Sequence, residues 1–288
     1  MQRQVFRSKS SLLIAAVVVA VAATVTTAAL ATFPGSNGRI AFRRYFNDDH
    51  SKSAIFTIKS DGRGELRVTH DPAGMVDDQP DWSPDGRLLA FTRCTANGPC
   101  SVYTVHSDGS NLKRLTPAAC TSGPPKCEDD ANISFLPDGK HVVFTRSTGK
   151  VKHGHDWDEI QHSEIVVTDL AGSSPRTLLA SKPYTADYDF AAFSPDGKRF
   201  VYERANAPWT KPGGGHSALF VANADGSGDH RITSWSLDAG DNADWSPDGN
   251  WIVFRTHVRS DHGCQIDLIH PDGTGIKQLT TFKPSGHW

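Results

Sequence analysis

A cluster of histidines and acids lies near the middle of the chain, and its residue types are those that bind metal ions. Its members are His153, His155, Asp156, Trp157, Asp158, Glu159 and His162. Neutral imidazoles and carboxylates suit zinc and similar ions. The spacing is not that of one helix face, however, and the H-E-x-x-H pattern of catalytic zinc is absent. We therefore expect a solvated loop that contributes His153, His155 and Trp157 to a binding surface, without a metal or other cofactor.

Aspartates recur six or seven residues before a repeated proline, and they form the second candidate group. They are Asp78, Asp130, Asp189 and Asp241. If folding brings them together, they would form a ring of carboxylates that binds a cation or a basic partner segment. Without such a ligand, the proton affinity of each carboxylate would be raised by its neighbours. Alternatively, each aspartate hydrogen-bonds a neighbouring backbone group and bridges structural units. The sequence leaves both interpretations open.

Nucleophilic catalysis has no support in the motifs, because G-x-S-x-G occurs nowhere in the chain. Paired carboxylates of a glycosidase are recognised by their separation in space, which a sequence does not show. No catalytic residue is assigned on this basis.

The N-terminus has the pattern of a targeting segment. Arg3, Arg7 and Lys9 precede an uncharged run over 10–32, and Ala29-Leu30-Ala31 supplies a small-x-small cleavage pattern. We expect residues 1–31 to be a signal peptide cleaved after Ala31 or an uncleaved membrane anchor, since the run is about long enough to span a bilayer. Residues 32–288 form the functional domain. Both alternatives place this domain outside the cytoplasm, in the periplasm, secreted or at the cell envelope.

The five cysteines gain meaning from export, because an oxidising compartment favours disulfides. Cys94 and Cys100 flank a short polar segment between two apolar runs, so a hairpin would place them face to face. Cys120 and Cys127 bracket a proline-rich loop. We predict two local disulfides, Cys94–Cys100 and Cys120–Cys127, with Cys264 unpaired.

Internal repeats indicate which elements position these residues. The segment D-W-S-P-D-G begins at Asp81 and again at Asp244, and related copies begin at Ser134 and Ala192. Each copy precedes an apolar run, and their prolines fall at 84, 137, 195 and 247. A second element, a tight turn followed by a Leu-Thr-like ending, recurs after each copy, as in Asp108-Gly109 before Leu115-Thr116. Asp in such turns caps its own backbone and Gly accepts a positive φ, so the turns are structural.

This repeat resembles that of the TolB-like (WD-type) β-propellers, and it covers roughly 38–280. The resemblance implies an all-β propeller of four-stranded antiparallel blades, with Trp82 and Trp245 packed between blades. Five repeat units are recognisable, so the ring is five-bladed or an incomplete six-bladed one. The first unit begins at Gly38 without its inner strand.

The strand order of such a propeller places the short turns at one end of the blades and every long insertion at the other. We call the second end the loop-rich face. Its connections between second and third strands are 43–53, 94–100, 147–163, 205–217 and 256–264. They contain most of the histidines, together with Trp157 and Trp209, and exposed aromatics beside polar groups are typical of binding surfaces.

Two functions of different class follow. The first, implied by the resemblance to TolB, is a non-catalytic propeller that binds a protein or peptide through the loop-rich face. The alternative is a carbohydrate-active lyase or hydrolase that uses the same face. Lys+Arg number 30 and Asp+Glu 32, a net charge of -2, so no global basic field favours nucleic acid or an anionic membrane surface.

Overall fold

The structure is a computed structural model. It describes residues 38–70, 74–95, 99–117, 127–151, 157–183, 185–206, 215–258 and 263–281, with the backbone alone at 127, 128, 150, 151, 157–161, 241, 257, 258 and 263. Within these residues the chain is built from β-strands joined by turns and loops, with one short 3-10 turn, as expected from the repeats.

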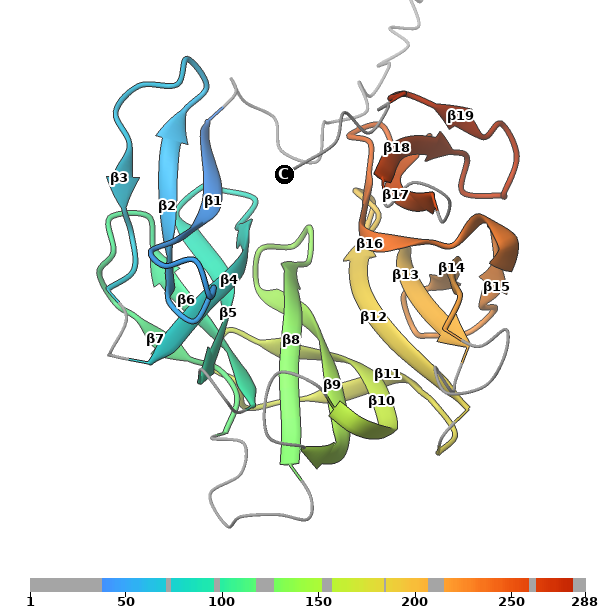
Figure 1. Cartoon of the computed structure of the whole chain (residues 1–288), viewed down its shortest axis with the longest axis horizontal. Helices are drawn as coiled ribbons and strands as arrows, with labels where there is room; N and C mark the ends of the chain where they lie inside the picture. Colours follow the sequence, from blue (N-terminus) through green and yellow to red (C-terminus); the bar gives the residue numbers. More distant parts are fainter. Residues whose placement is uncertain are drawn as a thin grey trace, which may run out of the picture.

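Five antiparallel blades follow one another around a central axis and make a five-bladed β-propeller (Figure 1). The first blade has three strands and each of the others has four. Blade 1 contains β1 (Arg39–Tyr45), β2 (Ser53–Lys59) and β3 (Leu66–Arg67), and blade 2 contains β4 (Met75–Trp82), β5 (Leu88–Thr95), β6 (Cys100–His106) and β7 (Lys113–Arg114). Blade 3 contains β8 (Cys127–Phe135), β9 (His141–Val151), β10 (Trp157–Asp169) and β11 (Arg176–Ala180). Blade 4 contains β12 (Ala186–Phe193), β13 (Arg199–Asn206), β14 (Ser217–Asn223) and β15 (His230–Arg231), and blade 5 contains β16 (Ala239–Trp245), β17 (Ile252–Val258), β18 (Gly263–Ile269) and β19 (Lys277–Gln278). A 3-10 turn, η1 (Trp235–Leu237), joins blade 4 to blade 5.

The repeated S-P-D-G segment makes the turn from the first to the second strand of a blade. In blade 2 the Ser83 hydroxyl donates to Asp85 Oδ1 (2.7 Å) and accepts from Leu88 N (2.9 Å), while Gly86 has φ +67°. The hydrogen bond from Ser83 lowers the pKa of Asp85, with a smaller contribution from Arg87 N. The aspartate therefore stabilises the turn.

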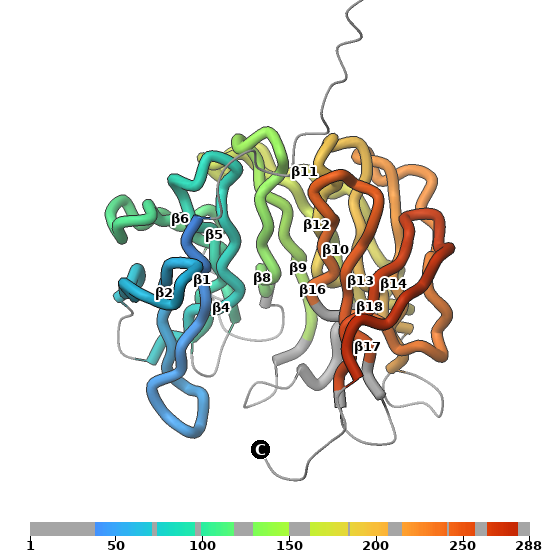
Figure 2. Tube along the Cα trace, turned by 90° about the horizontal axis from the view of Figure 1, so that it is seen from above, coloured from blue at the N-terminus to red at the C-terminus, as the bar shows by residue number. Residues whose placement is uncertain are grey.

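The hydrophobic core is divided into four clusters, and each lies between two consecutive blades. The cluster between blades 4 and 5, for example, joins Leu219 and Ile232 to Trp245 and Ile252. Successive side chains of a strand point to opposite faces of its sheet. The second strand of blade 2, 3 or 4 therefore contributes to the clusters on both sides of its blade. Figure 2 shows the blades standing side by side, with the β1–β2 connection at one end.

The connection expected over 147–163 is largely β-strand. β9 continues to Val151 and β10 begins at Trp157, with Ser147 opposite Ser163 and Val151 opposite Trp157. The ladder extends because Thr148 and Val151 have good strand propensity and the two strands twist around one another. Only 152–156 remain between them, and these lie outside the described residues.

Candidate functional site

The inner strands of blades 2 to 5 enclose a cavity of about 250 Å³ on the propeller axis. Its walls come from the second half of each inner strand, leading into the S-P-D-G turns. The lining residues that carry polar or charged groups include Gln79, Asp81, Asn132, Ser134, Asn242 and Asp244. The cavity therefore lies toward the end of the blades opposite the loop-rich face.

Each of these inner strands contains one irregularity at the same position. Gln79, Asn132, Phe190 and Asn242 have positive φ values of 52°, 54°, 49° and 54°, and the strand register shifts there. A left-handed backbone conformation is energetically costly for a phenylalanine, so the surrounding ladder must hold Phe190 in it. All four stand five residues before the repeat proline. The bulges rotate the strand ends and place these four residues around the axis.

Hydrogen bonds link the bulges from one blade to the next. Gln79 Oε1 accepts from Asn132 N (3.0 Å) and from Thr92 Oγ1 (3.2 Å). Asn132 Nδ2 in turn donates to Asp189 Oδ1. Blades 2, 3 and 4 are thus joined along the axis.

The predicted acidic series divides into two sets. Asp78 forms an ion pair with Arg43 of blade 1 and accepts from Gln79 N (2.6 Å), and Asp189 accepts from Phe190 N (3.2 Å) and Asn132. Both therefore sit at the bulges and bridge blades. Asp241 occupies the same position in β16, but the description there covers its backbone alone.

Asp130 belongs to the other set. Its carboxylate binds the Arg146 guanidinium through two hydrogen bonds (2.7 and 3.0 Å), as Asp77 binds Arg93 (2.5 and 2.7 Å). Asp77 and Asp130 both stand seven residues before the repeat proline, whereas Asp78 and Asp189 stand six before it. Because side chains alternate along a strand, one residue reverses the face. The spacing to the repeat proline therefore distinguishes the two sets, but our prediction treated spacings of six and seven residues as one series.

Three carboxylates meet at the inner edge of blade 4, and we call Asp187, Asp189 and Glu203 the acidic centre. Asp189 lies directly opposite Glu203 in the β12–β13 ladder, and Asp187 lies two residues before Asp189 on the same strand face. Burial raises the pKa of Asp187 to about 6. Burial also raises the pKa of Asp189 well above its ordinary value, and the charges of Asp187 and Glu203 raise it further.

Asp187 Oδ1 is buried and has no hydrogen-bond partner among the described residues. Asp187 is the second residue of β12 and pairs with Ala205, next to the end of β13. The acidic centre consequently lies at the loop-rich end of blade 4. Sequence reasoning found Asp189 but missed its two neighbours, because Glu203 reaches it only through strand pairing.

Two more carboxylates line the cavity itself. Asp81 accepts from Ser134 Oγ (2.9 Å) and Phe135 N (2.7 Å), whereas Asp244 accepts from Trp245 N (2.7 Å). Burial raises the pKa of Asp81 to about 6, with a smaller increase from the charge of Asp244. Neighbouring atoms also desolvate Asp244 and raise its pKa.

The predicted histidine and tryptophan residues are mostly beyond what the structure describes. His153, His155 and Trp209 lie outside the described residues, and Trp157 is described by its backbone alone, at the start of β10. His162, which is described, lies beside Glu164 with 3.3 Å between Nε2 and Oε1. Their binding role stays a prediction.

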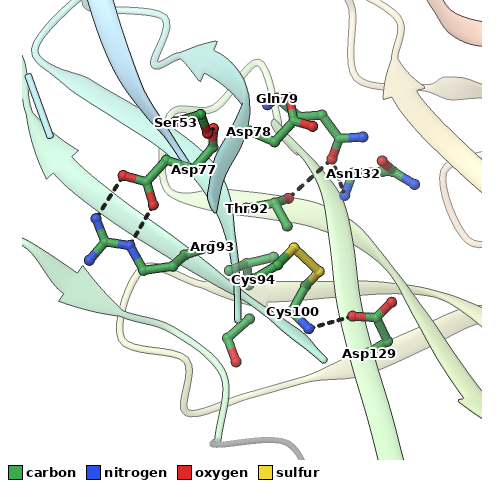
Figure 3. The surroundings of a disulfide bond; sticks show 12 residues. Ser53, Asp77, Asp78, Gln79, Thr92, Arg93, Cys94, Cys100, Asp129 and Asn132 are labelled. Carbon is green, nitrogen blue, oxygen red and sulfur yellow. Dashed lines mark hydrogen bonds and ion pairs between the residues drawn. A yellow bond between two sulfur atoms is a disulfide. The ribbon is translucent and has the colours of Figure 1, made fainter. Parts of the chain in front are cut away.

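The disulfide Cys94–Cys100 joins β5 to β6, which confirms the first predicted pair. The two cysteines are direct ladder partners, and Cys100 N donates to Asp129 Oδ1 (2.6 Å) of blade 3 (Figure 3). Figure 3 also shows the Asp77–Arg93 pair and the Gln79–Asn132 contact close by. Cys264 is unpaired among the described cysteines, while Cys120 lies outside the described residues.

No group of three or more histidine, cysteine or acidic side chains in the described ranges is arranged to hold a metal ion. The described part of the chain likewise contains no helix long and apolar enough to cross a membrane.

Comparison with known proteins supports the TolB-like propeller repeat, although no family model matches the chain. An uncharacterized peptidase of Bacillus subtilis, YuxL, is 23% identical over 210 residues, which are 73% of this chain and 26% of that protein. An uncharacterized protein of Agrobacterium fabrum is 29% identical over 151 residues, 52% of this chain and 46% of its own. A TolB protein of Novosphingobium aromaticivorans is 37% identical over 68 residues, covering 23% and 15% of the two chains. The chain thus spans less than half of these relatives.

Solved structures share the fold. A structure assigned to TolB from Agrobacterium tumefaciens superposes with a TM-score of 0.57 at 18% identity, over 84% of this chain and 81% of that one. Puromycin hydrolase superposes with a TM-score of 0.56 at 16% identity, over 88% of this chain and 39% of its own. These likenesses establish the propeller architecture, which hosts unrelated functions.

Proposed function

We propose that this protein is an exported, non-catalytic binding propeller that holds a basic side chain of a protein or peptide partner in its acidic centre. The observation that carries the proposal is the unpaired, buried Asp187 Oδ1 beside Asp189 and Glu203. Carboxylates that crowd together raise the energy of one another's ionised forms. A lysine or arginine from a partner would supply the donor that Asp187 Oδ1 lacks, together with a positive charge.

The position of the centre supports a macromolecular partner. It lies at the loop-rich end of blade 4, where Asp187 pairs with Ala205 near the end of β13. Exposed loops on a rigid scaffold are where binding residues concentrate. The basic side chain would anchor the partner in the acidic centre, and contacts with the loops would determine which partners bind.

A carbohydrate-active lyase or hydrolase is the second candidate. The pKa of Asp187, about 6, suits a general acid or base near neutral pH. This candidate predicts release of shortened or unsaturated products from acidic oligosaccharides, abolished by Asp187→Asn. The binding proposal predicts no turnover of such substrates.

Selection of peptides from a random display library tests the binding proposal. We expect lysine and arginine to be enriched among peptides that bind the wild-type protein. Replacing Asp187 and Asp189 together with asparagine should then weaken the selected peptide about tenfold, or 1.4 kcal/mol, since an amide keeps the shape without the charge.

The matched control replaces Asp108 and Asp225, exposed turn acids at the opposite end of the blades, with asparagine. Their hydrogen bonds serve Ser110 and Ser227 of their own turns. Equal weakening by both double variants, or selected peptides without basic residues, would contradict the proposal.

A further inference from the structure

Blade 4 contains an arginine that lacks the carboxylate partner of its counterparts. In blades 2 and 3 an arginine of the second strand stands opposite an aspartate of the inner strand and binds it through two hydrogen bonds; the pairs are Arg93 with Asp77 and Arg146 with Asp130. The same ladder position in blade 4 pairs Arg204 with Tyr188. A phenol ring therefore stands where the other two inner strands supply a counter-charge.

A second acceptor of blade 2 has no equivalent in blade 4. Arg114 of blade 2 donates to Ser101 Oγ (2.8 Å) of the third strand. The residues at the same ladder positions in blade 4 are Arg231 and Ala218. An alanine side chain accepts no hydrogen bond. Blade 4 thus has both arginines of blade 2 but neither of the side chains that accept from them.

Aromatic rings position the two guanidinium groups of blade 4. Arg204 lies over the rings of Tyr188 and Phe220, 5.7 and 5.2 Å from their centroids, and Arg231 lies over Trp235 at 5.4 Å. The Phe220 and Trp235 rings are in contact, with centroids 5.9 Å apart. Such contacts attract a guanidinium group to the face of a ring, but they provide no acceptor in the plane of its N–H donors.

No hydrogen bond or ion pair links either guanidinium to another residue in the ranges that the structure describes. Arg204 Nε is buried without an acceptor, which is costly for an N–H group. The acid next to this pair in sequence, Asp229, accepts from the Tyr202 hydroxyl (3.1 Å). Arg204 is half-buried and Arg231 is exposed, so the pair is accessible from solvent. These features are those of an anion-binding site.

The counterparts indicate which anion fits. Blades 2 and 3 place a carboxylate against the equivalent arginine, and the planar guanidinium fork matches a carboxylate through two parallel hydrogen bonds. A polyanion is disfavoured, because Glu203 of the acidic centre precedes Arg204 in β13 and would repel it. A peptide can carry both signs of charge, so it can satisfy the acidic centre and the arginine pair together.

We propose that Arg204 and Arg231 bind an acidic side chain of the same partner whose basic side chain enters the acidic centre. This inference rests on the proposed function, and it adds that the partner segment carries both charges. Adjacent residues of a strand point to opposite faces of the sheet, so the partner contacts both faces of blade 4, one beside Glu203 and the other beside Arg204. A peptide with a basic residue alone fills half of this site.

Peptide selection followed by a double-mutant cycle tests the arginine pair. The display library has one fixed lysine and random flanking positions, and we expect acidic residues to be enriched at the flanks. In the selected peptide, changing the acidic residue to its amide should weaken binding to the wild-type protein about tenfold. Arg204→Gln should bind the two peptides alike. Arg87→Gln, at an exposed turn of the opposite end, is the charge-matched control and should keep the tenfold difference.

Tyr188→Asp is the second variant, because it gives blade 4 the ladder pair of blades 2 and 3. The introduced carboxylate should occupy Arg204, so the acidic peptide and its amide should again bind alike. In both variants the lysine of the peptide should still contribute to binding.

Two results would overturn the inference and leave the proposed function standing. One is the selection of lysine peptides without acidic residues, and the other is a tenfold difference between the peptides that persists in Arg204→Gln. Tighter binding of polygalacturonate than of the peptide, lost in Arg204→Gln, would assign the pair to an acidic polysaccharide and would also overturn the inference. Peptides selected from the fully random library without basic residues would instead contradict the proposed function itself.

Discussion

Replacing Asp187 with asparagine measures the free energy stored in the acidic centre. Burial raises the folded-state pKa of Asp187 from 3.8 to about 6, a difference of about 2 units. At about 1.4 kcal/mol per pKa unit this amounts to about 3 kcal/mol, which residual solvent exposure reduces to about 1–2 kcal/mol. Loss of the Asp187 charge also relieves Asp189, which adds to the gain.

The sign of the effect follows from proton linkage. A carboxyl with a raised folded-state pKa binds its proton more tightly when folded, so its contribution to stability declines as the pH rises from about 4 to about 6. Asparagine does not ionise. We therefore expect Asp187→Asn to be more stable than the wild-type protein at pH 7.5, with the difference shrinking toward pH 4.

Urea unfolding at both pH values is the assay, and Asp169→Asn is the control of opposite sign. Hydrogen bonds from Ser173 and Ala171 lower the pKa of Asp169 to about 2, so that variant should lose stability at pH 7.5. If Asp187→Asn were less stable than the wild-type protein at pH 7.5, or if its effect were the same at both pH values, the reasoning would be refuted.

Three further predictions concern the scaffold. Trp245→Ala should cost about 3–5 kcal/mol in the free energy of unfolding, because the ring is 4% exposed and packed between blades, and an unchanged urea midpoint would refute the packing. Gly226→Ala should destabilise more than Gly62→Ala in thermal melts, since both have positive φ but only Gly226 would place a Cβ against a carbonyl oxygen. Mass spectrometry of the non-reduced protein should find Cys94–Cys100 and Cys120–Cys127, and free thiols at these positions would contradict the pairing.

The blades were predictable from the sequence because their signals are local. Ser83, Asp85 and Gly86 define a turn through contacts within six residues, and the apolar runs after each copy of that turn form the buried second strands. That the unit beginning at Gly38 has no preceding copy of the Trp-Ser-Pro-Asp-Gly segment was visible for the same reason. The different burial of two equivalent residues, Trp82 half-buried and Trp245 buried, was not visible, because it depends on packing between blades.

The acidic centre was only partly predictable. Asp189 was found from its spacing to the repeat proline, but Glu203 meets it through the β12–β13 ladder, whose register depends on a bulge at Phe190. The residue type of Phe190 gives no indication of a left-handed backbone conformation. Asp78 and Asp130 are separated for a simpler reason: they stand six and seven residues before the repeat proline, and one residue moves a side chain to the other face of the strand.

The pH dependence of binding to the wild-type protein tests the central claim most directly. A cationic side chain in the acidic centre favours the ionised carboxylates, so binding must release protons that Asp187 and Asp189 hold in the unbound protein. We predict that calorimetric titration with an arginine-containing peptide selected by display gives tighter binding at pH 7.5 than at pH 5, with proton release that disappears in the Asp187, Asp189 double variant. An affinity that does not change with pH, or proton release that persists in the double variant, would contradict the account.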